Sequence, residues 1–164
     1  MGKNLVVFYS AEGHTRDIAD QIAKNINADL FEIEPIKPYT PADLEWMNNT
    51  SRVFLEHEDT ALRDLALKTI TVPGWEAYDN VVFCYPIWWG IAAWPVNGFV
   101  RGVDWNKKNV YPVATSHSSP LGESDALLRE IANGGNWNAG KRFFQSANPD
   151  DIKHWCTTTF LENN

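Results

Sequence analysis

The strongest constraint on the fold is an apolar run that leads, through a short polar turn, into a helical pattern. Residues 4–9 are mostly apolar and β-branched with no polar alternation, which is typical of a strand buried on both faces of a parallel sheet. After the turn, Ile18, Ile22 and Ile26 recur every four residues and share one face of a helix. A buried strand followed by an amphipathic helix is the first half of a βαβ unit, so the sequence predicts an α/β fold.

The same alternation continues along the chain. Further strands are expected at 28–34, 80–85, 110–115 and 141–144, and helices at 92–100, 124–133 and 149–160. Thr40-Pro41-Ala42-Asp43 has the composition of a helix start, and residues 40–73 are expected to be mostly helical. Pro112 conflicts with an interior strand because it cannot donate to the ladder. With 164 residues and neither repeat nor linker, a single domain over 1–164 is predicted.

Composition excludes several function classes. The formal net charge of −7 argues against a nucleic-acid-binding protein, which would carry a basic face. The longest apolar runs are far shorter than the roughly 20 residues that a bilayer requires. Cys84 and Cys156 form no metal or redox motif, so no metal site is expected and a cytoplasmic protein with reduced thiols is predicted.

The first candidate binding loop follows the first predicted strand. Its candidate ligand-binding residues are Ser10, Glu12, Gly13, His14 and Thr15. The exposed N–H groups of the helix that follows, with its positive dipole end, would suit a phosphate. The alternative is that the hydroxyls only cap the helix. The loop matches neither a Walker A motif nor G-x-G-x-x-G.

The second candidate loop follows the strand at 80–85. It comprises Pro86, Ile87, Trp88, Trp89 and Gly90. Two adjacent tryptophans at a strand end cannot both point inward, so at least one would offer a face to a flat aromatic ligand. The alternative reading is that both are core or half-buried. Of the other tryptophans, Trp46, Trp75 and Trp155 are expected in the core.

The third candidate loop follows the strand at 110–115. Its candidate residues are Thr115, Ser116, His117, Ser118, Ser119 and Gly122. Alone, it could be a serine-rich loop selected for solubility. Because ligands of open α/β sheets bind at the carboxyl ends of the strands, the three loops together predict a site for FMN.

The quoted motifs resemble those of the flavodoxin family, in its short bacterial form. The resemblance rests on residues 8–15, on 78–90, on Pro95-Val96-Asn97 and on Thr115-Ser116, and it extends over nearly the whole chain. It implies a three-layer sandwich around a five-stranded parallel sheet of order 2-1-3-4-5. It also implies that the first loop holds the phosphate of FMN, the second the isoalloxazine and the third its polar edge.

Two residues depart from the family pattern in the first loop. Position 12 is usually Ser or Thr and position 14 often Asn, whereas this chain has Glu12 and His14. A carboxylate beside a phosphate is unfavourable, so we expect Glu12 to point outward while its backbone N–H serves the phosphate. Arg16 and a protonated His14 would offset the charge.

The resemblance implies an electron carrier between redox partner proteins such as a flavodoxin reductase, acting as a monomer or weak dimer. Relatives on the same fold are FMN-dependent NAD(P)H oxidoreductases that reduce quinones or nitro compounds, and this is the alternative. A second alternative is a flavin-free interaction domain. The acidic balance favours the carrier because it suits docking on basic partners. His117 would be a proton donor in an enzyme, but no catalytic residue is assigned.

Overall fold

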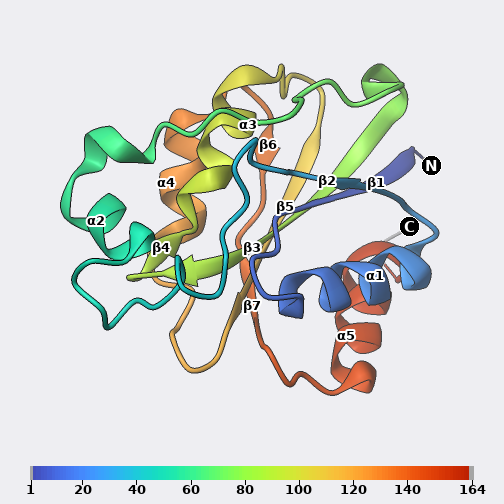
Figure 1. Cartoon of the computed structure of the whole chain (residues 1–164). Helices are drawn as coiled ribbons and strands as arrows, with labels where there is room; N and C mark the ends of the chain where they lie inside the picture. Colours follow the sequence, from blue (N-terminus) through green and yellow to red (C-terminus); the bar gives the residue numbers. More distant parts are fainter. Residues whose placement is uncertain (1, 163–164) are drawn as a thin grey trace.

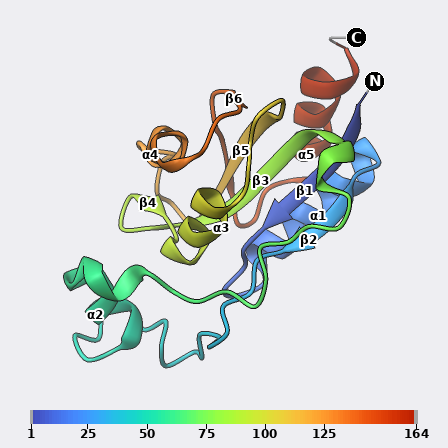
Figure 2. The ribbon, with the colours of Figure 1, turned by 90° about the horizontal axis from the view of Figure 1, so that it is seen from above.

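The computed structural model describes residues 2–162 and shows one sheet between two layers of helices (Figure 1, Figure 2). The strands are β1 (Lys3–Phe8), β2 (Asp29–Glu32), β3 (Tyr78–Trp88), β4 (Ile91–Ala92), β5 (Asn109–Ser116), β6 (Asn136–Trp137) and β7 (Lys141–Phe144). The α-helices are α1 (His14–Ile26), α2 (Arg52–Glu58), α3 (Asn97–Gly102), α4 (Ser124–Ile131) and α5 (Pro149–Cys156), with 3-10 turns at Thr60–Arg63, Trp75–Ala77 and Trp94–Val96 and a π-helical turn at Thr157–Leu161. The predicted α/β sandwich is confirmed.

The sheet has seven strands rather than the expected five. Its parallel strands follow the order β2-β1-β3-β5, and both β6 and β7 pair with β5 in the fifth position. The order 2-1-3-4-5 is therefore kept by position, with the last strand divided in two. The seventh strand is the short β4, which pairs antiparallel with β3.

The division of the fifth strand explains why Pro112 is tolerated inside β5. Val110 and Ser116 use their carbonyls to accept from Asn138 and Gln145, so the even-numbered residues of β5 face the fifth position. Pro112 shares that direction and lies between the last residue paired with β6 and the first paired with β7. Its missing N–H therefore faces the interruption between β6 and β7, where no ladder bond is lost.

Alternate residues of the buried strands pack against opposite helix layers. Val6 and Phe8 of β1 lie in one core cluster with the isoleucines of α1 and with Ile152 of α5. Leu5 and Val7 face the other cluster, which includes side chains from α3 and α4. Figure 2 shows α1 and α5 on one side of the sheet and α3 and α4 on the other. No helix within residues 2–162 is long and apolar enough to span a bilayer.

One predicted helical segment is wrong. Residues 40–73 are largely irregular, with one short helix, α2, and a 3-10 turn. Thr40 and Asp43 do exchange backbone-to-side-chain hydrogen bonds of 3.0 and 3.1 Å, as at a helix start, but these bonds close an isolated turn. The helix predicted at 92–100 is confirmed for residues 94–100, where a 3-10 turn continues into α3, while Ala92 ends β4. We call residues 36–65 the strap, because they extend from the edge of the sheet and carry α2 (Figure 2).

A chain of asparagine amides crosses the sheet near the amino ends of its strands. Asn80 donates to Asn4 at 3.0 Å, Asn109 to Asn80 at 3.2 Å and Asn136 to Asn109 at 3.1 Å. Asn4 in turn donates to the carbonyl of Ile26 at 3.0 Å. The three bonds between asparagines each connect one strand to the next, which favours one register across β1, β3, β5 and β6.

Asn80→Ala is expected to lower the free energy of unfolding by about 1 kcal/mol, because it removes two of these bonds from half-buried amides. The measurement is urea unfolding followed by circular dichroism. Asn136→Ala is the matched control, since Asn136 is exposed and ends the chain with a single bond. Equal losses of unfolding free energy in the two variants would contradict the idea that the asparagine amides act cooperatively.

Candidate functional site

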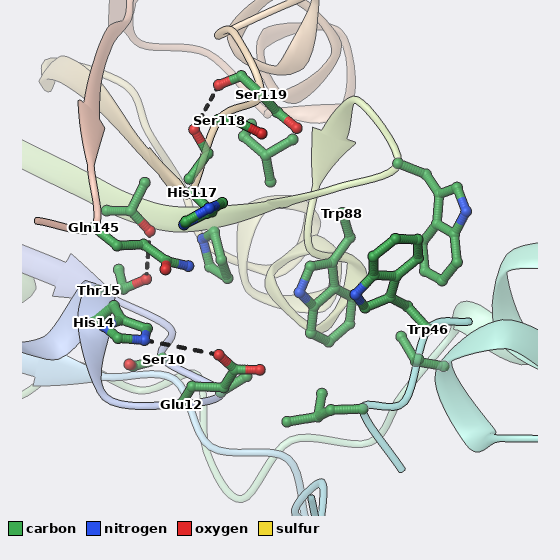
Figure 3. Close-up of a pocket in the computed structure, with 18 residues that line it drawn as sticks. Ser10, Glu12, His14, Thr15, Trp46, Trp88, His117, Ser118, Ser119 and Gln145 are labelled. Atoms are coloured by element: carbon green, nitrogen blue, oxygen red, sulfur yellow. Dashed lines mark hydrogen bonds and ion pairs between the residues drawn. The ribbon is translucent and has the colours of Figure 1, made fainter. Parts of the chain in front are cut away.

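The carboxyl ends of β1, β3 and β5 border a pocket of about 540 Å³. Its lining comprises Ser10, Ala11, Glu12, His14, Thr15, Leu44, Trp46, Val53, Pro86, Ile87, Trp88, Trp89, Thr115, Ser116, His117, Ser118, Ser119 and Gln145. Figure 3 shows the tryptophans Trp46 and Trp88 at one end, and Ser10, His14, Thr15 and Gln145 at the other. The structure therefore brings together side chains from all three loops that the sequence singled out.

At the polar end, the first loop leaves the start of α1 uncapped. Gly13 occupies the N-cap position in a left-handed conformation (φ 99°), and no side chain in the described chain caps the helix. The hydroxyl of Ser10 instead accepts from the N–H of Gly13 at 3.0 Å and so shapes the loop. The first-turn N–H groups of an α-helix have no partner within the helix. Because His14 and Thr15 line the pocket, these donors and the positive end of the helix dipole face it.

A buried pair of hydroxyls joins the first loop to the third. Thr15 and Thr115 lie 2.8 Å apart, Oγ1 to Oγ1. The third loop is further ordered by Ser116, whose hydroxyl donates to the carbonyl of Ser119. The carbonyl of Ser116 also accepts from the N–H of Gln145, which places that side chain at the pocket.

Thr115→Val is expected to destabilise the protein by about 1 kcal/mol, because it leaves the hydroxyl of Thr15 buried without this partner. The double substitution Thr15→Val with Thr115→Val should recover part of that loss, since neither buried hydroxyl then remains. Thermal unfolding of Thr15→Val, Thr115→Val and the double variant measures the coupling. Strictly additive losses would mean that the pair does not act as a unit.

At the aromatic end, Trp88 belongs to a strand and not to a loop. β3 continues through Pro86, Ile87 and Trp88 and turns at Trp89 and Gly90 into β4, so the predicted loop 86–90 is wrong as an irregular segment. Half-buried Trp88 lines the pocket, and the rings of Tyr9, Tyr39 and Trp94 contact it edge-on, with centroids 5.9, 5.3 and 5.0 Å away.

Trp89 adopts a left-handed backbone (φ 47°), and other rings occupy its faces. His57 stacks on it with centroids 4.3 Å apart and planes at 13°, and Trp94 lies 5.9 Å away at 24°. Both tryptophans line the pocket, in agreement with the inference that at least one of the two would offer a face to a ligand. Trp88 is the better placed of the two.

The strap supplies pocket residues that the sequence analysis missed. Leu44, Trp46 and Val53 line the pocket, and Trp46 is 62% exposed, contrary to its predicted place in the core. Trp75 and Trp155 are only half-buried, whereas Trp94 and Trp105 are fully buried. No local pattern marks the strap residues, because tertiary packing alone brings them to the sheet. Gln145 was within reach of the sequence, since it directly follows the predicted strand 141–144.

The geometry of the fold and of the pocket agrees with comparisons to known proteins. A sequence model of the flavodoxin family matches residues 3–159. The chain belongs to the flavodoxin family. A search of curated proteins found no match for this flavodoxin-family chain.

Solved structures resemble this flavodoxin-family protein along its length. A protein from Bacteroides eggerthii, provisionally described as a flavoprotein, is 33% identical with a TM-score of 0.86, over 99% of this chain and 100% of its own. A second, from Bacteroides uniformis and described in the same terms, is 33% identical with a TM-score of 0.84, over 94% of this chain and 97% of its own. A flavoprotein from Lactobacillus acidophilus in complex with FMN is 21% identical, with a TM-score of 0.65 over 87% of this chain and 93% of its own, and shows the shared fold alone.

Three predicted site residues of this flavodoxin-family chain do not line its pocket: Gly13, Gly90 and Gly122. They shape the loops instead, since each has a positive φ. A Cβ on Gly122 would approach the carbonyl oxygen of Gly90 to 3.0 Å, so the third loop rests against the β3–β4 turn.

Glu12 departs in part from its expected orientation. Its side chain is 57% exposed, yet it lines the pocket, and its Oε2 lies 3.8 Å from Nε2 of His14 (Figure 3). The expected offset by Arg16 is wrong, because that guanidinium pairs with Glu32. His14 is therefore the cation placed to offset Glu12 when protonated. Within residues 2–162, no cluster of three or more His, Cys, Asp or Glu side chains is arranged to hold a metal.

Proposed function

We propose that this protein binds FMN in the pocket and carries electrons between redox partner proteins. One observation supports this above all: a single pocket joins an uncapped helix N-terminus to an aromatic wall. Its volume of about 540 Å³ lies within the range of roughly 300–1,000 Å³ typical of small-molecule sites.

The residues present fit each part of FMN. The first-turn N–H groups of α1 and the hydroxyl of Thr15 suit the phosphate, which needs donors rather than a lysine. Trp88 and Trp46 provide apolar rings for the isoalloxazine. The third loop, with Ser116 and Ser118, offers hydroxyls and amides to the polar edge of that ring system. FMN, when bound, supplies reversible electron transfer, while the chain positions it and limits its contact with water.

The carrier role is supported by the charge of the chain. The formal net charge of −7 would steer association with basic partner surfaces such as that of a flavodoxin reductase. We further propose a cytoplasmic setting, in which the buried thiols of Cys84 and Cys156 remain reduced. Exchange between partners would suit a monomer or weak dimer.

The alternative is an FMN-dependent NAD(P)H oxidoreductase, and one observation favours it. His117 lines the pocket and carries an imidazole that could supply a proton to a substrate beside the flavin. Rapid anaerobic reduction of bound FMN by NADPH alone would favour this enzyme. A strict requirement for a reductase would favour the carrier.

The primary test is titration of FMN fluorescence with the purified protein. We expect saturable quenching at one flavin per chain, with riboflavin bound much more weakly because it lacks the phosphate. Equal affinities for FMN and riboflavin would contradict the phosphate assignment at α1. An absence of quenching at about tens of micromolar protein, corresponding to a binding free energy weaker than about −6 kcal/mol, would contradict the FMN site and favour the flavin-free domain.

A further inference from the structure

A buried carboxylate, Glu56, lies behind the aromatic end of the pocket. It belongs to α2 in the strap, is only 5% exposed, and does not line the pocket. Three donors from different side chains converge on it: the hydroxyl of Tyr39, Nε of Arg52 at 3.1 Å and Nε1 of Trp94 at 3.0 Å. A buried charge with this many partners is costly to disrupt, because each donor would lose its acceptor.

Arg52 connects this carboxylate to the first residues of the strap. Its guanidinium lies 3.8 Å from the ring centroid of Tyr39 and also donates to the carbonyls of Lys37 and Pro38. Burial, together with the hydrogen bond to Glu56, raises the pKa of Tyr39, so its phenol remains a donor at neutral pH. The first part of the strap is thereby tied to α2.

The same contacts extend from Glu56 to the pocket. Tyr39 and Trp94, which both donate to Glu56, are two of the rings that pack edge-on against Trp88. Trp94 belongs to the 3-10 turn after β4, whereas Tyr39 belongs to the strap. The carboxylate therefore joins two separate segments that both contact the ring of Trp88.

We propose that Glu56 is a positioning residue for the aromatic wall of the pocket. Through Tyr39 and Trp94 it holds the indole of Trp88 in one orientation and keeps the strap closed on the sheet. It thereby sets the geometry in which a flavin ring stacks, without touching the flavin. This inference rests on the proposed FMN site.

The test compares Glu56→Ala, Glu56→Gln and Tyr39→Phe with the wild type. Glu56→Ala should raise the dissociation constant of FMN about tenfold, the equivalent of losing one hydrogen bond to a charged acceptor. Glu56→Gln should raise it only a few-fold, because it keeps an acceptor for Trp94 or Tyr39 but turns an amide donor toward Arg52. Tyr39→Phe removes one donor and should resemble Glu56→Gln. The matched control is Glu130→Gln, an equal charge change at an exposed position on α4.

Two readouts separate positioning from a general loss of structure. The visible circular dichroism of bound FMN, measured at saturation, should change in the Glu56 variants because the ring stacks differently. Riboflavin affinity should fall by the same factor as FMN affinity, because the phosphate end is unaffected. If Glu56→Ala fails to fold, both measurements can still be made on Glu56→Gln and Tyr39→Phe.

Wild-type affinity and dichroism in all three variants would overturn the inference and leave the proposed function standing. A reduced number of binding sites with unchanged dichroism would also overturn it, because that pattern reports lost folded protein. Failure of the wild type to bind FMN would overturn the proposed function, and this inference with it.

Discussion

Trp88→Ala is expected to raise the dissociation constant of FMN at least tenfold. Trp88 is the half-buried ring of β3 that lines the pocket, and the rings of Tyr9, Tyr39 and Trp94 pack around it in T-shaped pairs. Loss of a stacked aromatic pair and of its buried area costs more than about 1.4 kcal/mol, the free energy that corresponds to a tenfold change in the dissociation constant. Fluorescence titration of FMN measures the change.

Trp89→Ala is the matched control, because His57 and Trp94 already cover the faces of that indole. We expect it to change FMN affinity only a few-fold. Since Trp88→Ala also removes packing against its neighbours, Trp88→Phe tests stacking with a smaller cavity. If neither tryptophan substitution weakens binding tenfold, the assignment of this aromatic platform is wrong. If Trp89→Ala has the larger effect, the choice between the two rings is wrong.

Glu12→Thr is expected to tighten FMN binding by about tenfold. A carboxylate about 5 Å from the phosphate costs about 3 kcal/mol per unit phosphate charge at an effective dielectric of about 20, and well under about 1 kcal/mol in water. Glu12 lines the pocket but is 57% exposed, so the expected effect lies between these limits. The measurement is the FMN dissociation constant at low and high salt.

The matched substitution Glu12→Gln removes the charge and keeps the shape, so it should tighten binding to a similar extent. The gain of both variants should shrink as salt rises, because the screening length falls from about 30 Å at 0.01 M to about 3 Å at 1 M. Riboflavin affinity should not change, since riboflavin has no phosphate. Unchanged FMN affinity in both variants would show that the carboxylate is out of range of the phosphate.

The helices and strands predicted from strong local patterns are found in the structure. Ile18, Ile22 and Ile26 are buried along α1 as their spacing indicates, and residues 80–85 lie within the buried β3. The objection to Pro112 fails because of a tertiary feature, the divided fifth strand, that no local pattern reveals. The wrong prediction of a helix at 40–73 also has a tertiary cause. Thr40 and Asp43 form the bonds of a helix cap, but the strap that follows them is held by Glu56, Arg52 and aromatic rings distant in the sequence.

The sequence by itself determined the α/β class, the alternation of the main buried strands with helices, and the three strand-end segments that border the pocket. These follow from apolar periodicity and from the rule that parallel strands end at one edge, both of which act over short stretches of chain. Only the tertiary structure decided that His57 and Trp94 stack on Trp89, that the strap brings Trp46 to the pocket, and that Arg16 pairs with Glu32. Each of these outcomes depends on contacts between segments far apart in the chain, and the energy of such contacts is set by packing geometry that no local sequence pattern encodes.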